Sequence, residues 1–114
     1  MKKLISLLVL IAATPAMAQV SADTANPLEG SADAAKAGHV LFAKMNCVGC
    51  HGYDLTGGMG PDLTDASWLY GGKPGEIFHT IAEGTSRGMP SWKDKLTPQE
   101  IWQIVTYIQS MHAN

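Results

Sequence analysis

The sequence predicts a small all-α domain with three main helices joined by long loops. Two stretches repeat apolar residues at helical spacing, namely Gly38, Leu41, Phe42 and Met45, and then Ile101, Ile104, Val105 and Ile108. Between them, residues 46–72 are rich in glycine and show no helical or strand-like repeat. No pair of segments has the alternating pattern of paired strands, so the class is helical.

The first helix is expected to begin at Ser31 or Asp33, since either side chain can serve as an N-cap, and to continue through residues 34–45. Gly38 falls on its apolar face. A glycine lowers helix propensity there, but it also lets another helix approach closely. A glycine that is merely tolerated is the alternative.

The middle and last helices have recognisable ends. Pro74 suits the first turn of a short helix and Gly84 suits its C-terminal stop. In the last helix Thr97 is an N-cap, Pro98 occupies the first position, and Glu100 completes a capping box. A second loop, residues 85–96, separates these two helices and contains Met89 and Pro90.

The first eighteen residues have the three parts of a secretory signal peptide. Lys2 and Lys3 precede a short apolar run, and Ala16-Met17-Ala18 provides a cleavage site. A membrane anchor is the alternative, but the run is shorter than the ~20 apolar residues that cross a bilayer. We therefore predict a signal peptide at 1–18, a flexible leader at 19–30 and the folded domain at 31–114, exported to the periplasm without a membrane span after cleavage.

The composition limits the function. With 114 residues, 46% hydrophobic and 16% charged, the chain suits one globular domain and not a disordered segment. The formal net charge is −2, and removal of Lys2 and Lys3 makes it −4. This charge excludes a basic nucleic-acid surface and suits a partner with a positive docking patch.

Both cysteines of the chain lie in one motif, Cys47-Val48-Gly49-Cys50-His51. Thiols three positions apart can each add to one vinyl group of the same haem, and the following histidine can then bind the iron. This C-x-x-C-H sequence is the signature of covalent c-type haem attachment. It predicts one haem c bound through Cys47 and Cys50, with His51 as an axial iron ligand.

Two other interpretations of the motif fit the sequence less well. A thioredoxin-like redox pair requires a β-α-β setting, which the sequence lacks. Zinc binding usually needs four protein ligands, whereas there is no second cysteine pair and the other histidines are scattered.

The chain resembles a class I cytochrome c from about Ala34 to His112. The matching marks are Gly38 with Phe42, the C-x-x-C-H motif, Gly60-Pro61-Asp62-Leu63, Met89-Pro90 and the capped terminal helix with Tyr107. The stretch 60–72 is similar to the cytochrome c domains of bacterial oxidases and to small cytochromes that serve quinoprotein dehydrogenases. The resemblance implies a class I cytochrome c fold wrapped around one haem.

It also implies two further site residues. The Pro61 carbonyl would accept a hydrogen bond from Nδ1 of His51 and so orient the ring; an ordinary turn proline is the alternative. Met89 would be the sixth iron ligand, with Met59 and then His79 as alternatives. Trp68, Trp92, Tyr70 and Arg87 could line the haem or contact its propionates. Ordinary packing explains the three aromatic residues better and a solvated loop charge explains Arg87 better, so none is predicted as a site residue.

The resemblance implies a monomeric electron carrier that is not an enzyme. It would accept single electrons from a dehydrogenase or a respiratory complex and pass them to an oxidase or another cytochrome. A quinoprotein alcohol dehydrogenase is one candidate donor. A cytochrome subunit fixed in such a complex is the first alternative. A haem enzyme or gas sensor with a labile sixth ligand is the second.

Overall fold

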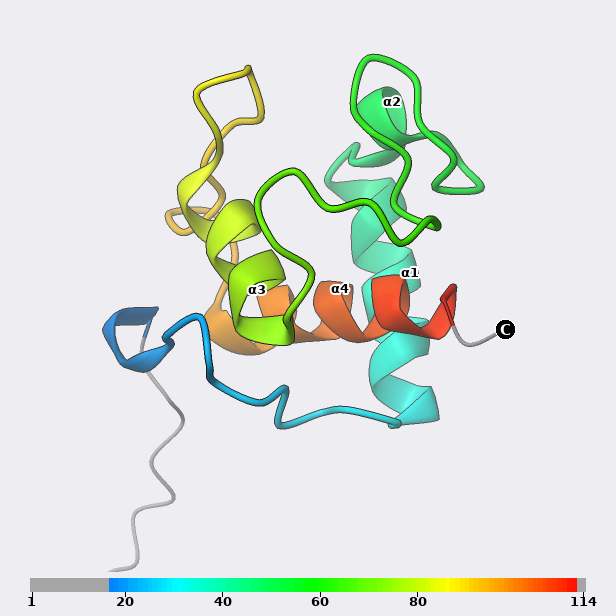
Figure 1. Ribbon diagram of the computed structural model, residues 1–114. Coiled ribbons are helices and arrows are strands. Elements are labelled where there is room, and N and C mark those ends of the chain that lie inside the picture. Colours follow the sequence, from blue (N-terminus) through cyan, green and yellow to red (C-terminus); the bar gives the residue numbers. More distant parts are fainter. Residues whose placement is uncertain (1–16, 113–114) are drawn as a thin grey trace, which may run out of the picture.

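The computed structural model describes residues 17–112, which fold into helices and loops without a strand. A short 3-10 helix, η1 (Met17–Gln19), precedes α1 (Ala32–Lys44), α2 (Val48–His51), α3 (Pro74–Glu83) and α4 (Pro98–Ser110). Figure 1 shows α4 running across α1, with α3 on one side of α4 and α2 above α1. The predicted all-α class is confirmed. The predicted signal peptide lies almost wholly outside the described residues and stays a prediction.

The helix ends follow the predicted caps. Ser31 caps α1, because its side chain accepts a hydrogen bond from the Ala34 N–H at 3.1 Å. Thr97 caps α4, where it accepts from the Glu100 N–H at 3.2 Å and its own N–H donates to the Glu100 carboxylate at 2.9 Å. Gly84, with φ +72°, ends α3 as expected.

Gly38 is the point where α1 and α4 touch. A Cβ atom there would overlap the carbonyl of Gln103 and lie 2.9 Å from Cβ of Tyr107, so only glycine allows this approach. His39 stacks on Tyr107 with ring centroids 4.7 Å apart, and Phe42 meets the same ring edge-on at 5.5 Å. The glycine on the apolar face of α1 is therefore needed for helix packing.

The hydrophobic core joins α4 to α1 and α3. Trp102 of α4 packs on Phe78 of α3, with ring centroids 4.6 Å apart. The largest fully buried side chains are Trp102, Phe42, Phe78, Leu55, Ile101, Ile104 and Val105. Most come from α4, as expected from its apolar stripe of Ile101, Ile104, Val105 and Ile108.

Residues 20–30 of the segment 19–30, which was expected to be a flexible leader, pack against the helices. Val20 is only 4% exposed, and its carbonyl accepts a hydrogen bond from Nε2 of His79 at 2.6 Å. Asn26 is buried and donates through Nδ2 to Thr106 and Gln109, both at 2.8 Å. Figure 1 shows this segment passing along the helices from α3 to the start of α1. The difference arises because these anchors pair with residues far along the chain, which local composition does not reveal.

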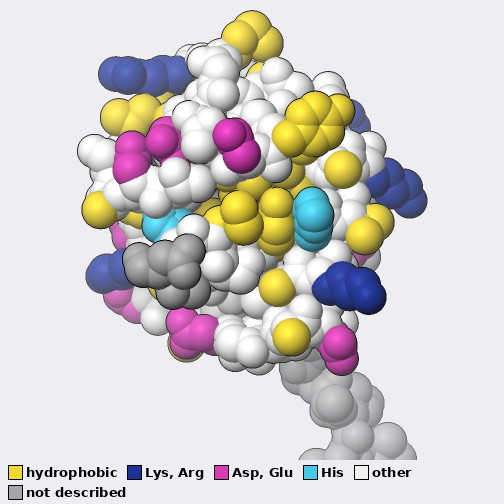
Figure 2. All heavy atoms as spheres, turned by 90° about the vertical axis from the view of Figure 1, so that its right-hand side faces the viewer, with side chains coloured by type: hydrophobic (Ala, Val, Ile, Leu, Met, Phe, Trp, Pro, Cys, Tyr) yellow, Lys and Arg dark blue, Asp and Glu magenta, His cyan; other side chains and the backbone are white. Residues whose placement is uncertain are grey.

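The long loop expected over residues 46–72 contains one short element, α2, and is otherwise irregular. Figure 2 views the face that lies to the right in Figure 1: hydrophobic side chains gather at its centre beside a histidine, and both signs of charge lie around them. This face therefore carries no continuous basic stripe. No helix within residues 17–112 has the length and apolar character needed to cross a membrane.

Candidate haem-binding site

The single turn of α2 gathers the three residues of the motif. The carbonyl of Cys47 accepts hydrogen bonds from the N–H groups of Cys50 at 3.2 Å and His51 at 2.9 Å. This helical turn places Cys47 and His51 four positions apart and therefore on one face, with Cys50 beside them. Cys47 is half-buried and packs against the core, whereas Cys50 is exposed.

The imidazole of His51 is held by the loop that follows it. Its ring is buried, and Nδ1 lies 3.0 Å from the carbonyl oxygen of Pro61. A carbonyl can only accept, so Nδ1 carries the proton and Nε2 of the neutral ring keeps its lone pair. Nε2 makes no hydrogen bond to any residue from 17 to 112. This is the arrangement that a metal-binding histidine requires.

The loop approaches the His51 ring through a glycine. A Cβ atom on Gly60 would lie 2.9 Å from Cε1 and 3.0 Å from Nδ1 of the imidazole, closer than ordinary contact. The same loop is tied to α2 by two hydrogen bonds, from Gly60 N–H to the Cys50 carbonyl at 2.9 Å and from Gly57 N–H to the His51 carbonyl at 2.8 Å. The ring is therefore fixed from one side by backbone.

The environment of Cys47 suits an uncharged sulfur. Burial raises the pKa of the Cys47 thiol to about 11, with a smaller contribution from the nearby Cys50. The thiol therefore stays protonated at neutral pH. A thioether, which carries no charge, meets no penalty at the same position.

The methionines of the predicted ligand set differ in position. Met89 is half-buried and packs against the core, whereas Met59 is 88% exposed. Met45 also packs against the core, at the end of α1, and Met111 at the end of α4 is 38% exposed. The loop after α3, which carries Met89, and the α2 turn lie on opposite sides of the upper half of the molecule (Figure 1).

The histidine alternative to Met89 is engaged elsewhere. Nε2 of His79 is bound to the Val20 carbonyl, at the outer side of α3. The remaining histidines are engaged too: His39 stacks on Tyr107, and Nε2 of His112 is bound to the Leu63 carbonyl. None of the three approaches the α2 turn through an interaction of the described residues.

The residues left open by the sequence fall into two groups. Trp68 and Trp92 pack against the core, and Trp68 also lies against His112 with centroids 5.4 Å apart. Tyr70 is 42% exposed and Arg87 is exposed. Half-buried apolar side chains thus come from α2, the 60–72 loop and the Met89 loop, and all of them pack against the core. Apolar surface of this kind is what a large flat cofactor covers.

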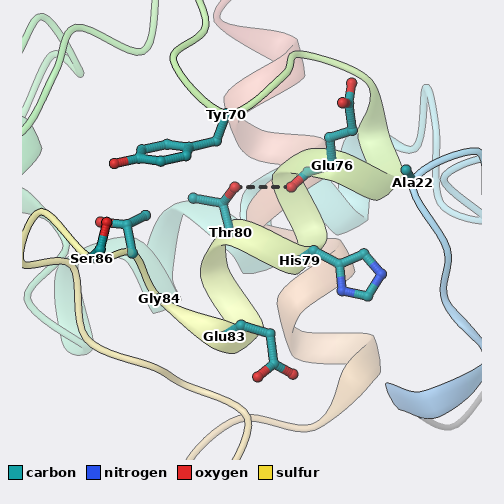
Figure 3. A pocket seen from close by; sticks show the side chains of 9 residues that line it. Ala22, Tyr70, Glu76, His79, Thr80, Glu83, Gly84 and Ser86 are labelled. Carbon is teal, nitrogen blue, oxygen red and sulfur yellow. Dashed lines mark hydrogen bonds between the residues drawn. The ribbon is translucent and has the colours of Figure 1, made fainter.

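A separate hollow of about 420 Å³ lies beside α3. Figure 3 shows Tyr70 above Thr80 and Ser86, with His79, Glu76 and Glu83 along the helix. Neither the motif residues nor Met89 line this hollow, so it is distinct from the α2 site.

The donor set at α2 fits a haem: two thiols, a histidine with a free Nε2 and bordering apolar side chains.

This helical fold and the α2 turn, with its two thiols and its buried histidine, define a class I c-type cytochrome. The chain belongs to the family described as cytochrome c oxidase, cbb3-type, subunit III, whose sequence profile matches residues 33–108. Membership confirms the predicted cofactor, one covalently bound haem c.

Two relatives are subunits of oxidases. The cbb3-type cytochrome c oxidase subunit FixP of Sinorhizobium medicae is 44% identical over 88 residues, which cover 68% of this chain and 30% of that protein. The subunit CcoP of Cereibacter sphaeroides is 38% identical over 77 residues, covering 65% of this chain and 26% of that protein. The chain thus spans less than a third of the length of these relatives.

Solved structures show the same fold. Cytochrome cL from the methylotrophic bacterium Methylophaga aminisulfidivorans matches with a TM-score of 0.71 and 31% identity, over 87% of this chain and 69% of that one. Cytochrome cL from Hyphomicrobium denitrificans matches with a TM-score of 0.70 and 27% identity, over 84% and 58%. The predicted class I cytochrome c fold is confirmed.

Proposed function

We propose that this chain is a periplasmic carrier of single electrons, with haem c attached through Cys47 and Cys50 and with His51 and Met89 as axial ligands. The observation that carries the proposal is the His51 ring, which Pro61 fixes through Nδ1 so that Nε2 is presented on the turn with both cysteines. The haem iron supplies a one-electron redox couple. The protein's own groups bind it, orient it and tune its potential.

The residues proposed as ligands suit electron transfer. Both are neutral, and a methionine thioether favours the reduced iron and raises the potential. With both axial positions filled, a substrate has no site at which to bind the metal. The proposed role is therefore outer-sphere electron transfer without bond-making chemistry.

Charge on the 45–72 segment supports a basic partner. This segment contains no lysine or arginine but has Asp54, Asp62 and Asp65. Two hydrogen bonds from Thr64 lower the pKa of the Asp62 carboxyl; the larger effect comes from the Thr64 hydroxyl and the smaller from its N–H. The hydroxyl and N–H of Thr56 lower the pKa of Asp54 in the same way. The carboxylates of Asp54 and Asp62 therefore stay ionised at neutral pH, on the segment that carries the proposed haem attachment site. We propose a redox partner with a positive patch; candidates are a quinoprotein alcohol dehydrogenase as donor and an oxidase or another cytochrome as acceptor.

The match to oxidase subunits favours one alternative, a cytochrome subunit fixed in a larger complex. Gel filtration of the purified, haem-loaded protein separates the two roles. A free monomer favours the carrier, and stable association with an oxidase or dehydrogenase favours the subunit.

The ligand assignment is tested by absorption spectra of the oxidised protein. We expect Met89→Ala to abolish the far-red band of the thioether–iron(III) bond. Met59→Ala is the matched control, because Met59 is exposed, and it should keep the band. A band that survives in Met89→Ala would show that another group binds the iron.

A further inference from the structure

The C-terminal end of α3 holds the segment that follows Met89. A helix cannot satisfy its own last carbonyl groups, so they need partners from outside. The carbonyls of Ile81 and Ala82 accept hydrogen bonds from the Trp92 N–H at 3.1 and 3.2 Å, and the Lys93 N–H donates to Ala82 at 3.1 Å. The chain just after Met89 is thereby bound to the end of the helix.

The segment before Met89 is closed onto the same helix end. The Thr85 N–H donates to the Met89 carbonyl at 3.0 Å, and the Gly88 N–H donates to the Thr85 carbonyl at 3.3 Å. Gly84 has φ +72°, and a Cβ atom there would overlap the Met89 carbonyl. The backbone of Met89 is therefore seated against the end of α3 from both directions.

Ser91 adds a side-chain hydrogen bond to this seat. Its Oγ donates to the Ala82 carbonyl at 2.5 Å, two residues beyond Met89. The side chain is exposed, so it contributes this bond and not core packing. By contrast, the hydroxyl of Thr85 accepts from the Met89 N–H at 3.4 Å, a long contact.

We propose that Ser91 is a positioning residue for Met89. Through its hydrogen bond to Ala82, Ser91 holds the loop on α3 so that the Met89 thioether stays in reach of the iron. The inference rests on the proposed function, because it takes Met89 as the axial ligand. For Met89 to leave the iron, its loop has to move away from α3. Loss of one hydrogen bond of ordinary net strength should make that movement roughly three- to tenfold more frequent.

The test is the affinity of the oxidised holoprotein for added imidazole, which competes with Met89 for the iron and removes the far-red band. Three variants are compared with the wild type: Ser91→Ala, Ser91→Thr and Ser110→Ala. The threonine variant keeps the hydroxyl at an exposed position. Ser110 is the matched control, because its Oγ also donates at 2.5 Å to a helix carbonyl, that of Tyr107, at the distant end of α4.

We expect Ser91→Ala to bind imidazole roughly three- to tenfold more tightly, with Ser91→Thr close to the wild type and Ser110→Ala unchanged. Thermal unfolding of the same variants checks that any loss of stability is shared by the two alanine variants. Equal imidazole affinity in Ser91→Ala and the wild type would overturn the inference, as would an equal increase in Ser110→Ala. A wild type without the far-red band would instead refute Met89 as the ligand, and the proposed function with it.

Discussion

Substitution of Gly60 by alanine tests how the structure fixes the proximal histidine. The added Cβ atom would lie 2.9 Å from Cε1 and 3.0 Å from Nδ1 of His51, whereas ordinary contacts are 3.4 to 4 Å. Gly60 does not have a positive φ, so alanine acts through its contacts: those with the His51 ring are the shortest, and the Cys50 carbonyl oxygen follows at 3.3 Å. The ring and the loop must separate by about half an ångström to accept it.

That separation breaks the hydrogen bond to Pro61. From 3.0 Å, the Nδ1 to oxygen distance would lengthen to about 3.5 Å, beyond useful hydrogen-bond range. This hydrogen bond makes Nε2 of His51 a stronger electron donor to the iron, which stabilises the oxidised state. Its loss, worth about 1 kcal/mol, should raise the reduction potential by roughly 40 mV for a one-electron couple.

The assay is a spectroelectrochemical titration of the haem-loaded wild type, Gly60→Ala and Gly49→Ala. Gly49 is the matched control within the motif, because the three atoms nearest to an added Cβ there all belong to the side chain of Asn46, which can move away. We expect the potential to rise in Gly60→Ala alone. An unchanged or lowered potential in Gly60→Ala, or an equal rise in Gly49→Ala, would refute the reasoning.

Three further substitutions test the packing of the helices and the turn in which Thr64 donates hydrogen bonds to Asp62. Asn26→Ala should lower the free energy of unfolding by about 2 to 3 kcal/mol, because it removes buried hydrogen bonds and leaves partners unsatisfied; urea unfolding measures this, and no loss would mean that the 20–30 segment is not anchored. Gly38→Ala should cost more than about 2 kcal/mol in the same assay, since its methyl group overlaps the Gln103 carbonyl; wild-type stability would contradict the close approach. Thr64→Val should raise the pKa of Asp62, which hydrogen bonds from Thr64 hold below its ordinary value of 3.8. Because the folded pKa is the lower one, the stability this carboxylate adds is present above its ordinary pKa and is lost as pH falls through the folded value. NMR titration of the wild type and of Thr64→Val should show the higher pKa of Asp62 in the variant. Identical titration curves would contradict the effect assigned to the Thr64 hydrogen bonds.

Features encoded within a few residues were predicted well. The capping box of Thr97 and Glu100 and the stop at Gly84 each depend on neighbours in sequence. Gly38, on the apolar face of the first helix, was predicted to let another helix approach closely, with a merely tolerated glycine as the alternative. The structure supplies its partner, Gln103.

Contacts between distant parts of the chain were missed. Asn26 pairs with Thr106 and Gln109, some eighty residues away, and nothing in the polar composition of 19–30 distinguishes it from a flexible arm. Ser91 is an ordinary loop serine in the sequence, and its bond to Ala82 appears only once the loop folds back on α3. The resemblance did lead us to expect a contact between His51 and Pro61, and the structure contains that hydrogen bond at 3.0 Å.

Mass spectrometry of the exported protein, denatured in acid and produced in a host that matures cytochromes, tests the central claim most directly. If Cys47 and Cys50 hold the haem by thioether bonds, the intact chain should carry the added mass of one haem, and the fragment containing residues 47–51 should retain it. A polypeptide of unmodified mass, with its pigment extracted into acidified acetone, would contradict covalent attachment at this turn.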